Sequence, residues 1–382
     1  MLTRLIKKQL DNYIKSDDFK IFFIWGPRRS GKTTILEEIS KEFSLPIFNF
    51  DLLSDRERFI PTEDALSSIV KESNIILIDE VQNYPEGTVS LKILHDKYKV
   101  KIIATGSSEL KKKSSKDFDT LAGRYTEHYC LPMSIGECVQ NSSVPAYEMS
   151  NFKYNLQSKL QIYGAYPEIY ANTELSEVDI INLLQSILDT YVLKDVVDIY
   201  NLKDEKLAKD ILTKIALQIG SEVSVREIAK SLNANETTVS NYIEIFIKNY
   251  ILIPLPSFKT NMRRAVSENR KLFFYDLGIR NILVKDFRDL NIRPDKGGVF
   301  ENFIVSEIEK RRKNLDIKET IYFYREYSGA KVDIVLEDYK KNYISIEIKV
   351  NEDKKSKDIF PIEHKFIVLN SKNYFQKIEG LF

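Results

Sequence analysis

The stretch Gly26-Pro27-Arg28-Arg29-Ser30-Gly31-Lys32-Thr33-Thr34 decides the fold of this chain. It follows the apolar run Ile21 to Trp25 and precedes a helical pattern that begins at Thr34. This is the Gly-x-x-x-x-Gly-Lys-Thr phosphate loop in the strand–loop–helix order that the motif requires. A Gly-rich turn that matches by chance is the alternative, and the flanking strand and helix disfavour it. The sequence therefore predicts a site for a nucleoside triphosphate.

The residues of the loop have distinct expected roles. Gly26 and Gly31 permit a tight turn that aims backbone N–H groups at phosphate oxygens. We expect Lys32 to reach the β- and γ-phosphates and Thr33 to ligate Mg²⁺, so the predicted cofactors are ATP and Mg²⁺. The two arginines of the loop either add phosphate contacts or point to solvent. The positions predicted to bind nucleotide are Gly26, Pro27, Arg28, Arg29, Ser30, Gly31, Lys32, Thr33 and Thr34.

Length and composition fit a large globular protein. The 382 residues suffice for two or three domains, and a hydrophobic content of 43% supports sizeable cores. No apolar run reaches the roughly 18 residues of a membrane span, and residues 1–8 lack the apolar centre of a signal peptide. Cys130 and Cys138 have no disulfide or zinc pattern around them. We therefore expect a reduced, cytoplasmic protein with no membrane partner.

Short apolar runs alternate with helical patterns after the phosphate loop. This alternation is typical of a parallel β-sheet with helices on both faces, so the predicted fold class is α/β. We place this P-loop core at residues 1–140. The expected strands are 46–51, 74–79, 100–105 and 125–131, and the expected helices are 62–73 and 87–98.

Two carboxylates end one of these strands. Asp79 and Glu80 follow four apolar residues, and buried carboxylates are unfavourable unless they meet a cation or water. We expect Asp79 to orient the Mg²⁺ shell and Glu80 to polarise the attacking water, which favours hydrolysis over binding alone. An ordinary strand exit is the alternative, and the order and spacing after Lys32 disfavour it. Ser107, at the next strand end, is either a γ-phosphate sensor or a local strand terminator.

The rest of the chain predicts three further regions. Residues 141–204 form a helical connector, 205–290 a winged-helix domain, and 291–382 a C-terminal α/β domain. Winged-helix order is indicated by three helical patterns followed by a strand, at 206–219, 225–232, 234–246 and 250–255. The Pro- and Gly-containing stretch 291–298 marks the last boundary. Beyond it we expect a helix at 299–312 and strands at 321–325, 331–336, 343–350 and 366–369.

The C-terminal region carries a second group of candidate catalytic residues. Side chains alternate faces along a strand, so Glu347 and Lys349 share one face. If the strands pair, Asp333 converges with them, and Glu301 on the preceding helix can add a fourth group. Carboxylates that hold Mg²⁺ beside a lysine suit metal-assisted phosphodiester cleavage. A charged, solvated strand face is the alternative. The pattern resembles the restriction-endonuclease-like Asp…Glu-x-Lys core, which also persists in binding or structural modules.

Several motifs together resemble the archaeal and bacterial AAA+ ATPases that carry a C-terminal nuclease-like domain. Besides the phosphate loop they are Leu77-Ile-Asp-Glu-Val-Gln82, Thr105-Gly-Ser-Ser108, Leu121-Ala-Gly-Arg124, Tyr163-Gly-Ala-Tyr-Pro-Glu168 and Tyr191-Val-Leu-Lys-Asp195. The resemblance covers nearly the whole chain. It implies that Arg124 stabilises transition-state charge, on a neighbouring subunit's nucleotide in an assembled complex. Members usually have Gln after the second loop position, whereas this chain has Arg28-Arg29-Ser30, a departure that leaves the catalytic positions intact.

Local basic clusters decide what can be expected of nucleic acid, because 57 basic and 56 acidic residues leave a net charge of only +1. The candidate recognition helix at 235–246 has no Lys or Arg, which is poor for phosphate contacts. The segment 259–271 carries five cations, Lys259, Arg263, Arg264, Arg270 and Lys271, around one Glu268. A second cluster lies at Lys111–Lys116. Both are candidate contacts to a DNA backbone, and solvated loops are the alternative, at least as strong for the second cluster.

These observations predict a Mg²⁺-dependent ATP hydrolase coupled to a nucleic-acid-binding or nuclease module. The predicted catalytic residues are Lys32, Glu80, Arg124, Asp333, Glu347 and Lys349, and the predicted metal ligands are Thr33, Asp79, Glu301, Asp333 and Glu347. The rival interpretation is a nucleotide-switched scaffold or sensor, in which the C-terminal domain is inert and the partners are proteins. A homo-oligomer is compatible with both.

Overall fold

The structure is a computed structural model that describes residues 2–107, 121–172, 174–194, 204–259, 270–326, 329–351 and 357–382. The chain divides into two compact units, Met1–Leu131 and Pro132–Phe382. Of the residues singled out above, Ser108, Lys111–Lys116, Asp195, Arg263, Arg264 and Glu268 lie outside the described residues. Among the helices of the described ranges, none is long and apolar enough to cross a membrane.

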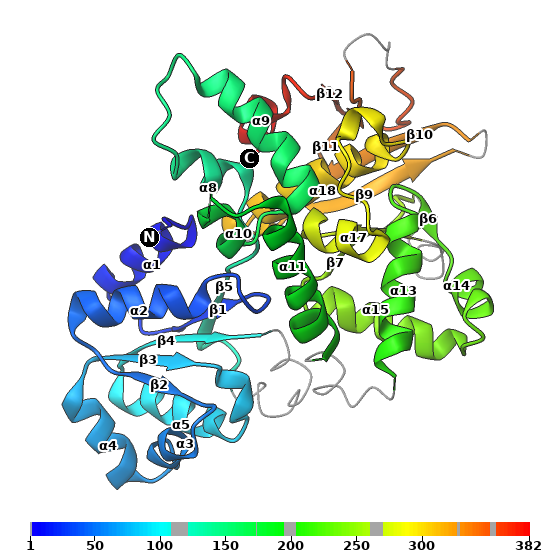
Figure 1. The fold of residues 1–382 in the computed structure, drawn as a ribbon. Helices are drawn as coiled ribbons and strands as arrows, with labels where there is room; N and C mark the ends of the chain where they lie inside the picture. Colours follow the sequence, from blue (N-terminus) through cyan, green and yellow to red (C-terminus); the bar gives the residue numbers. More distant parts are fainter. Residues whose placement is uncertain are drawn as a thin grey trace. The chain divides into compact units, whose positions relative to one another are not determined.

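A five-stranded parallel sheet forms the centre of the first unit, in the order β2-β3-β4-β1-β5 (Figure 1). The sheet confirms the predicted α/β class. β1 is buried along its whole length, as expected of a strand covered on both faces. The strands are β1 (Ile21–Trp25), β2 (Ile47–Asn49), β3 (Ile75–Asp79), β4 (Lys101–Gly106) and β5 (Tyr125–Tyr129).

Helices cover both faces of this sheet (Figure 1). Apolar side chains of α1 and α2, such as Leu10 and Ile39, pack with Phe22 and Ile24 of β1 into one core cluster. The bounds are α1 (Ile6–Lys15), α2 (Lys32–Phe43), α3 (Leu53–Arg58), α4 (Glu63–Glu72) and α5 (Gly87–Ile93), with short turns η1 (Val81–Asn83) and η2 (Leu94–Tyr98). The helix expected at 87–98 thus ends as a π-helical turn, η2.

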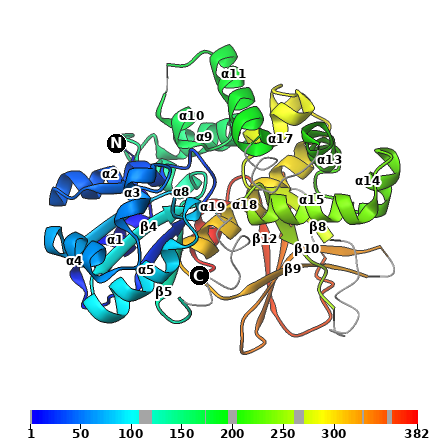
Figure 2. The same ribbon diagram turned by 90° about the horizontal axis from the view of Figure 1, so that it is seen from below.

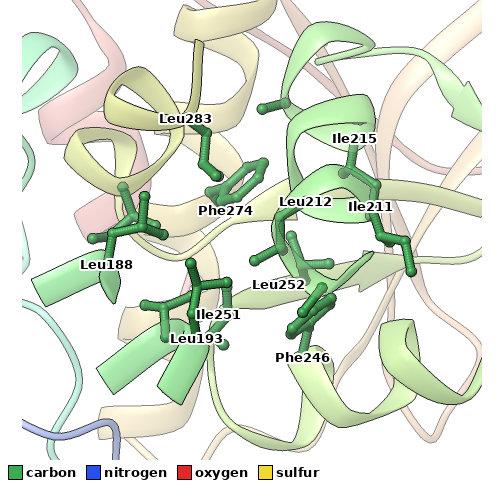
Figure 3. Packing of buried hydrophobic residues seen from close by; sticks show 14 of the residues in the cluster. Leu188, Leu193, Ile211, Leu212, Ile215, Phe246, Ile251, Leu252, Phe274 and Leu283 are labelled. Atoms are coloured by element: carbon green, nitrogen blue, oxygen red, sulfur yellow. The ribbon is translucent and has the colours of Figure 1, made fainter. Parts of the chain in front are cut away.

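One hydrophobic core of the second unit is formed by residues 166–283. Leu188, Leu212, Phe246 and Phe274 are among the buried residues of this cluster (Figure 3). The first helices are α8 (Ile135–Gln140), α9 (Met149–Tyr163), α10 (Pro167–Ala171), α11 (Glu177–Ile187) and the π-helical η3 (Leu188–Lys194).

Three further helices and three short strands follow in the order α13, β6, α14, α15, β7, β8. The strands form an antiparallel sheet in the order β6-β8-β7. Side chains of Asp204, Ser224 and Asn235 each accept a backbone N–H bond at the start of a helix, which fixes where the helices begin. The bounds are α13 (Glu205–Leu217), β6 (Glu222–Val223), α14 (Val225–Ser231), α15 (Glu236–Lys248), β7 (Leu252–Leu255) and β8 (Arg270–Phe274).

The Gly-Ala-Tyr-Pro-Glu motif packs against the start of α17 (Leu277–Val284). Gly164 has a φ of 80°, and a Cβ there would lie 2.1 Å from Asp276 Oδ1. The N–H of Ala165 donates to Asp276 Oδ2 at 2.6 Å. Burial raises the pKa of Asp276, and these backbone donors oppose that shift. Gly164 is therefore required for a close approach within this unit.

The stretch 291–298, predicted as a boundary, is held in place by an ion pair and by close packing against the segment after α13. It contains the turn η4 (Leu290–Ile292) and the start of α18 (Lys296–Asn314). Arg293 is buried and pairs with Asp295 at 2.9 Å. A Cβ on Gly298 would lie 2.8 Å from the carbonyl oxygen of Ile219, so glycine permits α18 to pass the end of α13.

A four-stranded sheet, in the order β12-β11-β10-β9, completes the second unit, and its strands β9, β10 and β12 are labelled in Figure 2. β10 pairs with both β9 and β11 antiparallel, and β11 pairs with β12 parallel. A backbone bridge from Ser257 to Phe323 joins the chain after β7 to β9. The bounds are β9 (Thr320–Arg325), β10 (Lys331–Glu337), β11 (Tyr343–Ile348), β12 (Lys365–Leu369) and α19 (Tyr374–Glu379).

Candidate nucleotide site and C-terminal charge cluster

The phosphate loop connects β1 to α2, as the sequence predicts. Gly31 precedes the helix with a φ of 97°, and Arg29 also adopts a positive φ of 59°. Lys32 is buried, and its Nζ donates to the carbonyl oxygens of Gly26 at 3.0 Å and Pro27 at 2.9 Å. Burial lowers the pKa of Lys32, and the negative charge of Glu80 partly opposes this. The ammonium group is thus held on loop carbonyls, where a phosphate can compete for it.

Thr33 and Asp79 meet although they are 46 residues apart in the chain. The Thr33 hydroxyl donates to Asp79 Oδ2 at 2.8 Å. Asp79 Oδ1 accepts from the Thr105 hydroxyl and, at 3.0 Å, from the N–H of Glu80. Hydroxyl and carboxylate oxygens are the donors that Mg²⁺ prefers, so this pair fits the ion. Sequence reasoning missed Thr105 as a partner of Asp79.

Glu80 lies at a strained position beside a buried amide. Its φ is 54°, a conformation that non-glycine residues rarely adopt and that is often found at functional sites. Gln82 is buried, its Nε2 donates to a Glu80 carboxylate oxygen, and its Oε1 accepts from the N–H of Ser107 at 3.2 Å. A Cβ on Gly106 would lie 2.7 Å from Gln82 Oε1. One amide therefore connects the ends of β3 and β4.

Ser107 fits one of its two predicted roles better than the other. Its backbone N–H holds Gln82, and its buried Oγ has no hydrogen-bond partner among the described residues. A buried hydroxyl without a partner is unfavourable unless a ligand or water completes it. This unsatisfied hydroxyl favours the γ-phosphate sensor over the strand terminator as the role of Ser107.

Arg124 lies at the N-terminal ends of the strands, whereas the phosphate loop lies at their C-terminal ends. β1 and β5 are parallel with Ile21 opposite Tyr125, so Arg124 precedes the strand whereas the loop follows Trp25. Four residue steps of about 3.3 Å, about 13 Å in all, separate the two ends of β1. Arg124 Nε donates to Asp96 Oδ1 at 2.8 Å, and this bond, together with one from His95, lowers the pKa of Asp96 to about 2. Arg124 is thus remote from the nucleotide site of its own chain.

Arg4 is a residue of this site that sequence reasoning missed. Its guanidinium is buried and donates to the carbonyl oxygen of Ser30 in the phosphate loop and, at 2.6 Å, to that of Leu131. No motif links residue 4 to the loop, so the sequence offers no signal that finds it.

The four predicted C-terminal residues converge within the second unit. Ile334 opposes Ile346 in the β10–β11 ladder, which places Asp333 beside Glu347. Asp333 is buried and accepts from the N–H of Ile348 at 2.9 Å. Burial and the charge of Asp333 raise the pKa of Glu347. The strand pairing on which the prediction depended is therefore present.

Each carboxylate of this cluster already has a lysine partner. Glu301 pairs with Lys271 at 2.7 Å, Asp333 with Lys331 at 3.3 Å, and Glu347 with Lys349 at 2.5 Å. Burial raises the pKa of Glu301, against the opposing charge of Lys271. Burial alone would lower the pKa of Lys331, but the negative charges of Asp333, Glu301 and Glu347 together outweigh it and the net shift is upward. We call Lys271, Glu301, Lys331, Asp333, Glu347 and Lys349 the C-terminal charge cluster.

The cluster bears on the predicted metal ligands. Within the described ranges, no group of three or more His, Cys, Asp or Glu side chains is arranged to hold a metal ion. The carboxylates of Asp333 and Glu347 have the chemistry that Mg²⁺ accepts, whereas Glu301 is engaged by Lys271. A metal ion here would have to compete with lysines of the same chain.

One cation of the segment 259–271, Lys271, is buried and not available to DNA, which corrects the sequence-based prediction for it. Lys271 is buried between Glu301 and the ring of Phe323, whose centroid lies 5.4 Å from Nζ. Arg270 pairs with Glu244 at 2.6 Å. Both cations belong to β8, which pairs with β6 and β7.

Comparisons with known families agree with the candidate nucleotide site. Residues 18–139 match the family described as an AAA domain, so the chain carries an AAA-type P-loop ATPase domain. Residues 155–294 and 296–376 match two families described as domains of unknown function, DUF8612 and DUF4143.

Related proteins extend over most of the chain. The uncharacterized proteins MJ1637 and MJ1544 of Methanocaldococcus jannaschii are 26% and 27% identical over 315 and 370 residues, which are 73% and 91% of this chain. The chain covers 65% and 79% of those two proteins. An uncharacterized protein of Haemophilus influenzae is 23% identical over 401 residues, 98% of this chain and 94% of its own length.

Solved structures show only a distant likeness. The Holliday junction branch migration motor RuvB of Thermotoga maritima is 15% identical, with a TM-score of 0.31 over 67% of this chain and 90% of that one. The replication initiator DnaA bound to AMPPCP and single-stranded DNA is 16% identical, with a TM-score of 0.28 over 63% and 85%. Scores of this size support no conclusion about this chain.

Proposed function

We propose that this protein is a Mg²⁺-dependent ATP hydrolase of the AAA+ type. The hydrogen bond from Thr33 to Asp79 carries the proposal, because it joins the phosphate loop to the acidic end of β3. Thr33 and Asp79 would hold Mg²⁺, which neutralises phosphate charge during hydrolysis. Lys32 exchanges its loop carbonyls for the terminal phosphates, and the backbone N–H groups before α2 bind the others.

Glu80 is the proposed base of the reaction. It follows Asp79 at the end of β3, and Gln82 orients its carboxylate. The carboxylate would orient the attacking water and take its proton as the bond to the γ-phosphorus forms. Ser107 would contact the γ-phosphate at the end of the neighbouring strand, β4.

The test compares Glu80→Gln with the wild-type chain in nucleotide binding and in single-turnover hydrolysis. Glu80→Gln keeps the shape of the side chain but removes the base. We expect hydrolysis to fall about 10²- to 10⁴-fold while ATP affinity stays within about threefold. Lys32→Ala, by contrast, should lose ATP affinity, because it removes the cation that faces the phosphates. Wild-type turnover in Glu80→Gln would show that another residue activates water.

Arg124 is proposed to act on the nucleotide of a neighbouring chain in a homo-oligomer. Its position at the far edge of the sheet from the phosphate loop supports action between chains. A mixture of Arg124→Ala and Lys32→Ala chains should recover turnover that neither variant has alone. If the mixture recovers no turnover at concentrations where the chains associate, a shared site is contradicted.

The second unit is the proposed nucleic-acid module. The order of α13, β6, α14, α15, β7 and β8, with its three-stranded antiparallel sheet, supports a winged helix. The convergence of Asp333, Glu347 and Lys349 supports a nuclease-like fold for residues 291–382. In a cutting enzyme, Asp333 and Glu347 would hold Mg²⁺ and Lys349 would orient water.

Cleavage distinguishes this module from the rival scaffold. Cutting of DNA and RNA substrates with Mg²⁺ or Mn²⁺ should disappear in Asp333→Ala together with metal binding, and in Lys349→Ala with most metal binding kept. Absence of both cutting and metal binding in the wild-type chain would favour a scaffold whose C-terminal domain is inert. An ATP turnover that a protein, and no nucleic acid, accelerates would point the same way.

A further inference from the structure

Arg4 joins three backbone segments of the first unit. One nitrogen, Nη1, donates to the carbonyl oxygen of Ser30 and to Cys130 Sγ at 3.3 Å. The other, Nη2, donates to the carbonyl oxygen of Leu131 at 2.6 Å. Arg4 is only 7% exposed, so these contacts are shielded from water. A planar guanidinium with its donors in a fixed fork can hold carbonyls in two directions at once.

The segment around Cys130 also touches the phosphate loop directly. The N–H of Cys130 donates to the carbonyl oxygen of Trp25 at 2.7 Å, at the last residue before the loop. A Cβ on Gly26 would lie 1.9 Å from the carbonyl oxygen of Cys130, so the two backbones are in contact. The Cys130 thiol donates to the carbonyl oxygen of Ser30 at 3.1 Å. The loop therefore cannot shift at Gly26 or Ser30 without disturbing residue 130.

The contact with Ser30 also fixes a donor of the phosphate loop. In a planar trans peptide the C=O of one residue and the N–H of the next point in opposite directions. Holding the Ser30 carbonyl on Arg4 therefore turns the N–H of Gly31 away from Arg4. Gly31 is the residue that precedes α2, where backbone N–H groups bind phosphate.

We infer that Arg4 is a positioning residue that sets the phosphate loop for nucleotide and couples it to Leu131, where the chain leaves the first unit. The inference rests on the proposed nucleotide site. A phosphate that accepts a hydrogen bond from the Gly31 N–H contacts the same peptide group whose carbonyl Arg4 binds. Coupling between two sites is reciprocal. If nucleotide changes the conformational equilibrium at Leu131 by some factor, a change of conformation at Leu131 changes the nucleotide affinity by the same factor.

The experiment uses the full-length chain in three variants beside the wild type. Arg4→Met removes the donors, Arg4→Lys keeps the charge but not the fork, and Lys7→Met is the matched control. Lys7 lies on α1, just after Arg4 in the chain, and pairs with Asp11 and Glu42 outside the loop contacts. ADP and ATPγS affinities are measured by titration with Mg²⁺, after thermal melting shows each variant folded. Hydrogen exchange of the Cys130 amide is then followed with and without nucleotide.

We expect Arg4→Met to weaken both nucleotides at least 10-fold, Arg4→Lys to recover part of the loss, and Lys7→Met to stay within twofold. Nucleotide should slow exchange of the Cys130 amide in the wild type but not in Arg4→Met at saturation. Unchanged affinity in Arg4→Met would overturn the positioning role, and a retained exchange response would overturn the coupling. If Arg4→Met does not fold, wild-type affinity and exchange in Arg4→Lys overturn the inference. A wild-type chain that binds no nucleotide would instead refute the proposed function.

Discussion

The nucleotide site and the C-terminal charge cluster hold their charged groups in opposite ways. In the nucleotide site, neutral groups hold the charges: carbonyls bind Lys32, hydroxyls bind Asp79, and the amide of Gln82 binds Glu80. In the C-terminal charge cluster, each carboxylate is paired with a lysine of the same chain.

This difference decides how readily each site accepts a charged ligand. A neutral partner offers dipoles that a phosphate or Mg²⁺ can replace at modest cost. A buried ion pair must be broken first, which leaves an uncompensated charge. The structure therefore favours a first site that binds ligand readily and a second site in which the buried Lys271–Glu301 pair would have to be broken before Glu301 could hold a metal ion.

The strongest test of this contrast is Lys271→Met, because both Lys271 and Glu301 are buried. Loss of the lysine leaves Glu301 with burial but without its nearest cation, and we expect the free energy of unfolding to fall by about 3–5 kcal/mol. Lys331→Met is the matched control, since that lysine side chain is 51% exposed and should contribute about 1 kcal/mol or less. Denaturant unfolding measures both.

A double-mutant cycle sharpens this result. Glu301→Gln removes the other charge of the pair, so Lys271→Met with Glu301→Gln should lose less stability than the sum of the two single changes. Losses that simply add would mean that the pair does not interact, and the contrast between the sites would fail.

A smaller effect is expected for Gln82→Ala in the nucleotide site. The change removes the amide that orients Glu80 but leaves Lys32, Thr33 and Asp79 in place. We expect kcat for ATP to fall about 10-fold, equivalent to about 1.4 kcal/mol, with KM unchanged. Asn83→Ala, at the neighbouring position of η1, should change neither constant. A rise in KM with constant kcat would mean that Gln82 supports binding instead of Glu80.

The smallest effect concerns the surface pair of Arg124 and Asp96. The pKa of Asp96, about 2, is depressed from its ordinary value of 3.8, so the pair stabilises the fold above pH 3.8 and loses this effect as pH falls toward 2. Arg124→Ala should raise the pKa of Asp96 toward 3.8, as measured by NMR titration of its carboxyl carbon. An unchanged pKa would mean that His95 alone holds the carboxylate. Because Asp96 is largely exposed, its effect on stability should be slight.

Local patterns allowed much of this protein to be predicted from its sequence. The phosphate loop, the strand that ends in Asp79 and the strands at 331–337 and 343–348 were recognisable because periodicity and turn residues act over a few positions. Thr33 and Asp79 were both predicted to serve Mg²⁺, and the hydrogen bond between them shows that they lie at one site. Domain boundaries and the roles of the site residues remain predictions.

Only the tertiary structure determined which distant residues pair with each charged side chain. The sequence placed Lys271 among cations for DNA, yet the path of β8 buries it against Glu301. Arg4 has no motif, and it reaches Ser30 and Leu131 only because α1 packs on the sheet beside α2. A charge in a sequence looks the same whether it meets solvent, a carboxylate or a backbone carbonyl. Its partner is set by how strands and helices far apart in the chain pack together, and that packing is a property of the whole fold.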